Sequence, residues 1–146
     1  MKYHFLIHTD GGSRGNPGPA AFGVVIESVS AGWRKEYGEY IGEATNNVAE
    51  YSAVIFALKK LKSLIGSKKA KEGSVEVHAD SELLVKQLNG EYKIKEENIR
   101  GLFLDVWNMK LDFGGVVFKH IPREQNHGAD KMVNQALDKE NGRLAL

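Results

Sequence analysis

The chain has 146 residues, of which 42% are hydrophobic and 27% charged, a balance that fits one globular domain with a single core. No apolar run approaches the roughly 20 residues that a membrane-spanning helix needs, and the absence of cysteine excludes disulfides and thiolate metal sites. The net charge of +1 leaves nucleic acid open as a partner, because an acidic metal site can cancel a basic surface in the sum.

The start of the chain enters a strand pattern directly and lacks the apolar stretch of a secretory leader, so we expect a cytoplasmic protein. Two segments of strand character, residues 2–8 and 20–27, flank a stretch rich in glycine, asparagine and proline. Asp10 lies where this loop begins, and a carboxylate beside exposed backbone amides suits a metal ion that holds a phosphate ester. The alternative is a long hairpin turn in which Asp10 caps its own backbone.

A third segment, residues 32–42, carries aromatic side chains typical of a strand, and the short connections predict an antiparallel meander. A helix of about twenty residues then begins at Thr45 or Asn46, either of which can cap it. Its apolar stripe consists of Ala53, Val54, Ala57, Leu58 and Leu61. Glu50 precedes this stripe by three residues, so we expect it to point toward the sheet and to need a cation or a partner there. The alternative is that Glu50 reaches solvent at the open end of the stripe.

Residues 74–79 alternate as a short strand, and a helix follows that ends near Gly90. Asp80 stands at the end of this strand, where it can equally serve as a plain helix N-cap. Residues 91–95 link to a helix over residues 96–111. We expect its inner side to carry Ile99, Leu102, Phe103, Val106, Trp107 and Leu111.

Residues 115–121 form a last strand that Pro122 ends, and a final helix begins near His127 or Gly128. Its apolar stripe is Ala129, Met132, Val133, Ala136 and Leu137. Asp130 lies in its first turn, a position that the helix dipole alone also favours for aspartate. Residues 141–146 form a tail that either frays or docks an apolar end.

The order of these elements predicts an α/β fold in a single domain over residues 1–146. We expect a five-stranded mixed sheet, with strands one to three antiparallel and helices on both faces. The four acidic residues lie at strand ends or in the first turns of sheet-packing helices, so they can converge on one edge. Four clustered carboxylates repel one another unless divalent cations neutralise them, which points to metal binding. Each alternative is plausible singly, but all four together are not.

Four segments carry a resemblance to type 1 ribonuclease H (ribonuclease HI), and they follow that family's order over essentially the whole chain. They are Asp10-Gly11-Gly12-Ser13-Arg14-Gly15-Asn16-Pro17-Gly18, Thr45-Asn46-Asn47-Val48-Ala49-Glu50, His78-Ala79-Asp80-Ser81 and Pro122-Arg123-Glu124-Gln125-Asn126-His127-Gly128-Ala129-Asp130. The resemblance implies a ribonuclease H-like fold and cleavage of the RNA strand of an RNA/DNA hybrid, with 5′-phosphate and 3′-hydroxyl ends. It also implies that Asp10, Glu50, Asp80 and Asp130 are catalytic metal ligands.

On this resemblance we expect a two-metal mechanism, with two Mg²⁺ or Mn²⁺ ions about 4 Å apart across the scissile phosphate. Asp10 would bridge the ions, Glu50 and Asp80 would complete one coordination shell, and Asp130 would belong to the other. RNA is told from DNA by its 2′-hydroxyls. The resemblance assigns substrate contacts to Gly11, Gly12, Ser13, Arg14, Asn16, Thr45, Asn46 and Asn47.

Two departures from the family pattern shape the expectations. Many bacterial members carry a basic, Trp-containing protrusion, whereas residues 91–97 offer only a short link with Lys93 and Lys95. Substrate binding would then rely on salt-sensitive phosphate contacts from Arg14, these two lysines and the lysines after the first long helix. Where the family often places an auxiliary histidine, the loop is short. Arg123 and His127 are the candidates for that role, ahead of His120.

Two other functions remain open. A catalytically silent binding module would gain only repulsion from clustered carboxylates near a polyanion. The second is a different metal-dependent nuclease of the same fold. The exonuclease relatives with four acidic residues usually begin their first motif with Asp-x-Glu, which Asp10-Gly11-Gly12 does not match. We expect a monomer without an obligate protein or membrane partner.

Overall fold

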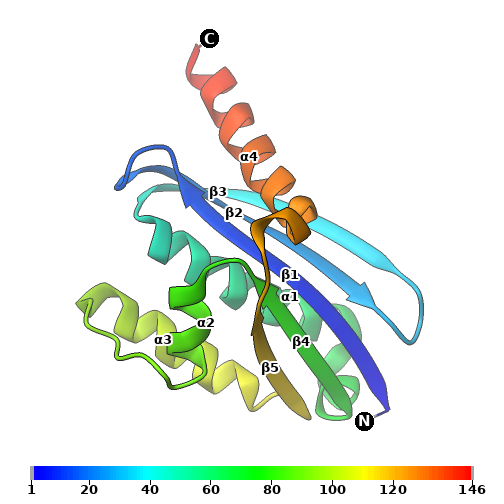
Figure 1. Ribbon diagram of the computed structural model, residues 1–146. Coiled ribbons are helices and arrows are strands. Elements are labelled where there is room, and N and C mark those ends of the chain that lie inside the picture. Colours follow the sequence, from blue (N-terminus) through cyan, green and yellow to red (C-terminus); the bar gives the residue numbers. More distant parts are fainter. Residues whose placement is uncertain (1, 146) are drawn as a thin grey trace.

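The computed structural model describes residues 2–145, with side chains described to residue 143. Five strands form one mixed sheet in the order β3-β2-β1-β4-β5 (Figure 1). The strands are β1 (Tyr3–Ser13), β2 (Gly18–Ser28), β3 (Arg34–Ala44), β4 (Gly73–Ala79) and β5 (Gly115–His120). The first three pair antiparallel, while β4 runs parallel to both β1 and β5. The predicted α/β fold and the antiparallel order of its first strands are confirmed.

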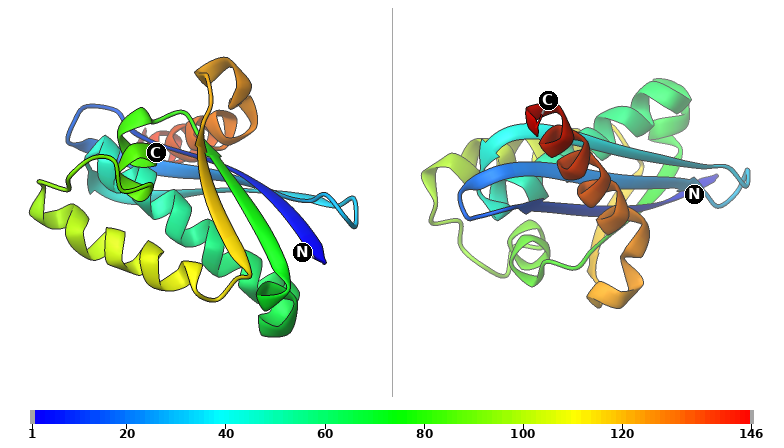
Figure 2. Two further views of the ribbon diagram at one scale, coloured as in Figure 1. Left: turned by 60° about the horizontal axis from the view of Figure 1, so that its bottom comes forward. Right: turned by 90° about the horizontal axis from the view of Figure 1, so that it is seen from above.

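Helices cover both faces of the sheet, as predicted (Figure 2). They are α1 (Asn46–Lys71), α2 (Glu82–Leu88), α3 (Glu97–Lys110) and α4 (His127–Ala145), with a 3₁₀ turn, η1 (Arg123–Gln125), before α4. The first three lie on one side of the sheet, and α4 crosses β1, β2 and β3 on the other. Among residues 2–145, no helix combines the length and apolarity that crossing a membrane requires.

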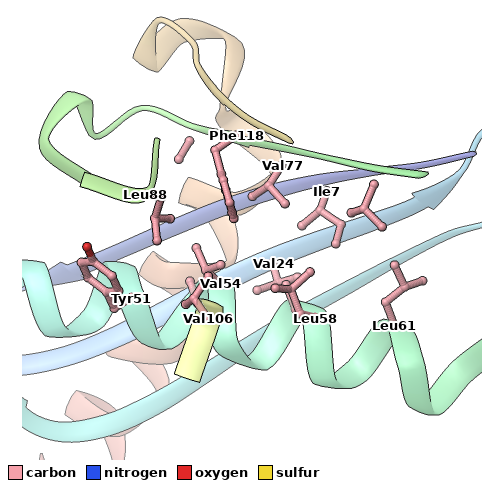
Figure 3. Packing of buried hydrophobic residues seen from close by; sticks show 14 of the residues in the cluster. Ile7, Val24, Tyr51, Val54, Leu58, Leu61, Val77, Leu88, Val106 and Phe118 are labelled. Atoms are coloured by element: carbon pink, nitrogen blue, oxygen red, sulfur yellow. The ribbon is translucent and has the colours of Figure 1, made fainter. Parts of the chain in front are cut away.

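The main core lies between α1 and the sheet. The five residues of the predicted α1 stripe are all buried. Figure 3 shows Val54, Leu58 and Leu61 directed at side chains of the sheet, among them Ile7 and Val24. Each fully buried aliphatic side chain of this size contributes about 1.5–3 kcal/mol relative to an exposed one. This packing fixes the axis of α1, and with it the position of its first turns.

On the other face, α4 approaches β2 and β3 so closely that only glycine fits beneath it. A Cβ atom on Gly23 or Gly38 would overlap the backbone of Ala129 or Met132. A small second core of Ala21, Val133 and Leu137 completes this contact. The start of α4 is therefore held firmly against the sheet.

Several predicted boundaries were wrong because strand pairing extends beyond the local pattern. The ladder between β1 and β2 continues to Ser13 and Ala20, so the expected long loop shrinks to residues 14–17. The first long helix spans 26 residues, but Gly66, with a φ of +86°, interrupts it with a kink, so the regular part before the kink has the predicted length of about twenty residues. Thr45 is its N-cap, as one of the two predicted alternatives.

The predicted inner side of α3 was only partly correct. Ile99 and Val106 are buried, but Trp107 and Leu111 are 51% and 66% exposed. The helix packs against α1 rather than the sheet, so only a narrow stripe of it is covered. At the other end of the chain, α4 continues through Ala145, and Leu146 lies outside the described residues.

Candidate active site

Strand register brings the first two carboxylates together. In the parallel ladder between β1 and β4, Thr9 is paired with Ala79. The next residues along the two strands are Asp10 and Asp80, so they stand side by side as β4 ends. Ser81, not Asp80, caps α2, because its side chain accepts a hydrogen bond from the backbone N–H of Leu84. The Asp80 carboxylate is thereby free of the capping role that the sequence allowed.

A glycine contact brings Glu50 to the same place. A Cβ atom on Gly11 would overlap the α1 backbone at Ala49 and Glu50, so the missing side chain lets the helix lie directly on β1. The Glu50 carboxylate accepts a hydrogen bond from the Ser81 hydroxyl. Glu50 is half-buried and faces the sheet edge, as its place before the apolar stripe predicted.

The fourth carboxylate comes from the opposite face. Asp130 lies in the first turn of α4, close enough to Asp10 for its charge to raise the pKa of that group. Asn134, one turn later, donates to the Asp130 backbone carbonyl over 3.2 Å. Elements from both faces of the sheet therefore place acidic side chains near one another at one edge of the sheet.

These groups line one open cleft with a volume of about 580 Å³. Its lining comprises Asp10, Gly11, Gly12, Ser13, Arg14, Asn46, Asn47, Glu50, Asp80, Arg123, Asp130, Val133, Asn134 and Leu137. All four carboxylates singled out in the sequence are among them. The convergence predicted from their positions at strand ends and helix starts is therefore present.

The electrostatics of the cleft disfavour ionised carboxylates in the absence of cations. Burial, together with the nearby charges of Asp80 and Asp130, raises the pKa of Asp10 to about 8. Burial also raises the pKa of Glu50 to about 7; Asp80 adds to this rise, and the hydrogen bond from Ser81 opposes it.

No three His, Asp or Glu side chains in the described part of the chain enclose a metal site by themselves. The cleft instead offers separate oxygen donors on an open surface. This donor set suits Mg²⁺-like cations, which keep several waters and take few carboxylates together with phosphate oxygens of a substrate. The residues present fit such ions and do not fit a closed structural metal centre.

Six of the eight predicted substrate residues line this cleft. Asn46 accepts hydrogen bonds from the backbone N–H and the hydroxyl of Ser13, over 2.9 and 3.1 Å. Asn16 and Thr45 lie outside the lining: Asn16 accepts from the Asn46 backbone N–H, and Thr45 caps α1. These two side chains support the residues that face the cleft.

Two other predicted contact residues are engaged with neighbours. The Arg14 guanidinium lies 2.6 Å from the Asp138 carboxylate in an exposed ion pair with α4. Asn47 donates to the Glu96 carboxylate over 3.0 Å, which ties the start of α1 to the segment before α3. The described chain between α2 and α3 contains no further helix.

The candidates for the auxiliary role are separated by the structure. Arg123 lines the cleft. His127 does not; it borders a different cavity of about 160 Å³ with His8, Glu27 and Arg34. His120 is exposed, with its Nε2 atom 3.3 Å from the Asp80 backbone oxygen. Of the three, only Arg123 lines the cleft that the four carboxylates share.

Three residues of the site were not identified from the sequence. Ser81 bonds Glu50, Asn134 lines the cleft, and Asn126 donates to Asp80. Asn134 falls one helical turn after Asp130, a spacing that could have revealed it. Ser81 and Asn126 act through contacts distant in sequence, which no local pattern signals.

Comparison with known proteins identifies relatives of this chain. Residues 8–136 match the family model described as reverse transcriptase-like. Ribonuclease HI of Halobacterium salinarum is 39% identical over 129 residues, which cover 88% of this chain and 62% of that protein. The bifunctional protein Rv2228c of Mycobacterium tuberculosis is 36% identical over 134 residues, covering 91% of this chain but only 35% of its own length. The chain therefore spans about a third to two thirds of these curated relatives.

Solved structures agree with these matches. LC11-RNase H1, solved in complex with an RNA/DNA hybrid, is 47% identical with a TM-score of 0.86; the match covers 93% of this chain and 98% of that one. The N-terminal RNase H domain of the mycobacterial protein is 33% identical with a TM-score of 0.87, covering 98% and 99% of the two chains.

Proposed function

The chain belongs to the type 1 ribonuclease H family, and we propose that it hydrolyses the RNA strand of RNA/DNA hybrids as an endonuclease, leaving 5′-phosphate and 3′-hydroxyl ends. The observation that carries this proposal is the convergence of Asp10, Glu50, Asp80 and Asp130 in one open cleft. The complex of LC11-RNase H1 with a hybrid supports the choice of substrate.

The four carboxylates would hold two Mg²⁺ or Mn²⁺ ions. Bound there, the ions would supply positive charge that activates the attacking water and stabilises the leaving oxygen. The raised pKa values of Asp10 and Glu50 support this assignment, because carboxylates that resist ionisation when alone gain most from a neighbouring cation. Protons and metal ions compete for these two groups, so metal binding would release protons.

The remaining residues of the cleft would orient the nucleic acid. The glycine backbone at Gly11 and Gly12 leaves room for close approach, and Asn46, held by Ser13, presents an amide at the cleft wall. Amides can pair with the 2′-hydroxyls that distinguish RNA from DNA. Arg123 offers a fixed cation for a phosphate oxygen. Since one chain supplies all of these groups, we propose that the active form is a monomer.

The test is cleavage of an end-labelled RNA/DNA hybrid with Mg²⁺ or Mn²⁺, comparing the natural chain with Asp10→Asn. Single-stranded RNA and duplex DNA serve as substrate controls. We expect metal-dependent cuts in the RNA strand only, absent in the variant and in a chelator. Binding of the hybrid without cleavage under either metal would refute the proposal and leave a silent binding module.

A further inference from the structure

Asn126 is completely buried in a surface turn. It lies between η1 and α4, and its exposed fraction is 0%, whereas residues 123–125 and 127 around it are all exposed. An amide loses several hydrogen bonds to water when it is buried, so its position requires compensating partners. Those partners lie at the centre of the carboxylate cluster.

The Asn126 Nδ2 group donates two hydrogen bonds. One goes to the backbone oxygen of Thr9 over 2.9 Å, and one to the Asp80 Oδ2 atom over 3.3 Å. Both partners are pure acceptors, so the amide can face them only with its NH₂ group. Its Oδ1 atom has no hydrogen-bond partner among the described residues, so these two donations alone set the orientation of the amide.

The same residue also connects to the fourth carboxylate. The backbone oxygen of Asn126 accepts from the Asp130 N–H over 3.1 Å in the first turn of α4. Thr9 directly precedes Asp10 in β1. One side chain and its carbonyl thus join β1, the end of β4 and the start of α4, the three elements that carry Asp10, Asp80 and Asp130.

We propose that Asn126 is a positioning residue that holds the Asp80 carboxylate beside Asp10 in the orientation that binds a divalent cation, an inference that rests on the proposed function. The hydrogen bond donated by Asn126 restricts rotation of the Asp80 side chain and holds its carboxylate in one orientation. Groups that orient a metal-binding side chain typically change metal affinity or activity by about 10- to 100-fold when they are replaced.

The test measures Mn²⁺ binding by calorimetry in the natural chain and in Asn126→Leu, which keeps the branched shape but removes the donor. The control is Gln87→Ala, which removes another buried amide, bonded to Tyr51 and the Lys93 backbone away from the cleft. We expect Mn²⁺ to bind Asn126→Leu about 10- to 100-fold more weakly, with affinity unchanged in the control. In saturating Mn²⁺ the variant should recover kcat, with an unchanged KM for the hybrid.

A second measurement needs no folded variant at residue 126. In NMR spectra of the full chain, the Asn126 side-chain NH₂ resonances should shift in Asp80→Asn and stay in place in Glu50→Gln. Asn126 NH₂ resonances that do not shift in Asp80→Asn would overturn the proposal. A folded Asn126→Leu that binds Mn²⁺ as tightly as the natural chain would also overturn it. A natural chain that binds Mn²⁺ but cuts no hybrid would overturn the proposed function alone, because the affinity comparison does not depend on cleavage.

Discussion

The core beneath α1 and the cleft at the sheet edge are lined by residues only a few positions apart in sequence, but bringing side chains together is favourable in the core and unfavourable in the cleft. From Ala53 to Leu61, the inward side chains of α1 are apolar and buried, so every contact favours the folded state. Glu50, three residues before Ala53, lies on the same face of α1 and lines the cleft together with three further carboxylates. The core therefore stabilises an arrangement of carboxylates that repulsion in the cleft, without cations, opposes.

The largest expected effect comes from removing the central carboxylate. Asp10→Asn should lower hybrid cleavage by about 1,000-fold, because bound metal ions contribute several kcal/mol of transition-state stabilisation. The same change should raise the melting temperature of the metal-free protein, since it removes a buried acid and its repulsion. Hybrid cleavage assays and thermal unfolding in chelator measure the two effects. A variant that loses both activity and stability would show that Asp10 is a structural residue.

The opposite pattern is expected in the core. Leu58→Ala should reduce the free energy of unfolding by about 2–5 kcal/mol, because Leu58 is 1% exposed and its loss leaves a cavity. Cleavage per folded molecule should stay close to that of the natural chain well below the melting temperature. Urea unfolding and steady-state assays at low temperature test this separation. A large fall in kcat with little loss of stability would show that the core and the cleft are not energetically separate.

The pH dependence of stability should reveal the cleft directly. The pKa of Asp10 is about 8 in the folded chain against an ordinary value of 3.8, and that of Glu50 is about 7 against 4.5. Because both pKa values are raised by folding, the two groups stabilise the folded chain fully below pH 4. This contribution to the free energy of unfolding, about 2 kcal/mol or more, is lost as the pH rises toward 8. Thermal unfolding across this pH range, measured once in chelator and once in excess Mn²⁺, gives the size of this loss. Mn²⁺ should cancel the loss, and Asp10→Asn should reduce it; a flat profile for the natural chain would contradict the assignment.

Gly11 lies where α1 packs directly on β1 beside Glu50, so replacing it should affect both stability and activity, but less strongly. Gly11→Ala should destabilise the chain by about 1–3 kcal/mol and lower kcat, because its Cβ would push α1 and Glu50 away from β1. Gly101→Ala is the matched control, since nothing lies within 4 Å of its added carbon in α3. That control should gain up to about 1 kcal/mol from helix propensity. Equal effects at the two positions would refute the role given to Gly11.

The smallest effect concerns the ion pair at the cleft rim. Asp138→Asn should change the free energy of unfolding by less than about 1 kcal/mol, because the pair with Arg14 is exposed. Freed from this partner, Arg14 should bind hybrid phosphate more strongly, so KM should fall a few-fold at low salt and converge with the natural value at high salt. Arg14→Ala should show the reverse, and a KM that responds to neither change would exclude Arg14 from the binding surface.

The order of elements, their apolar faces and the place of four acids could be predicted because each depends on local spacing. Alternation in residues 74–79 and the three- and four-residue spacing of the α1 stripe are properties of single segments, and both match the structure. Glu50 could be placed because it belongs to the same helical face. These features need no knowledge of which segments later meet.

Tertiary structure decided what depends on contacts between distant segments. Pairing with β2 extended β1 through Ser13, and packing on α1 alone left Trp107 exposed. Burial and the approach of Asp80 and Asp130 raise the pKa of Asp10, and the fold, not the motif, places His127 away from the cleft and Asn126 beside Asp80. Residue types and local spacing therefore set which chemical groups are present, while the assembled sheet sets their geometry, because register and burial arise only when strands and helices pack together.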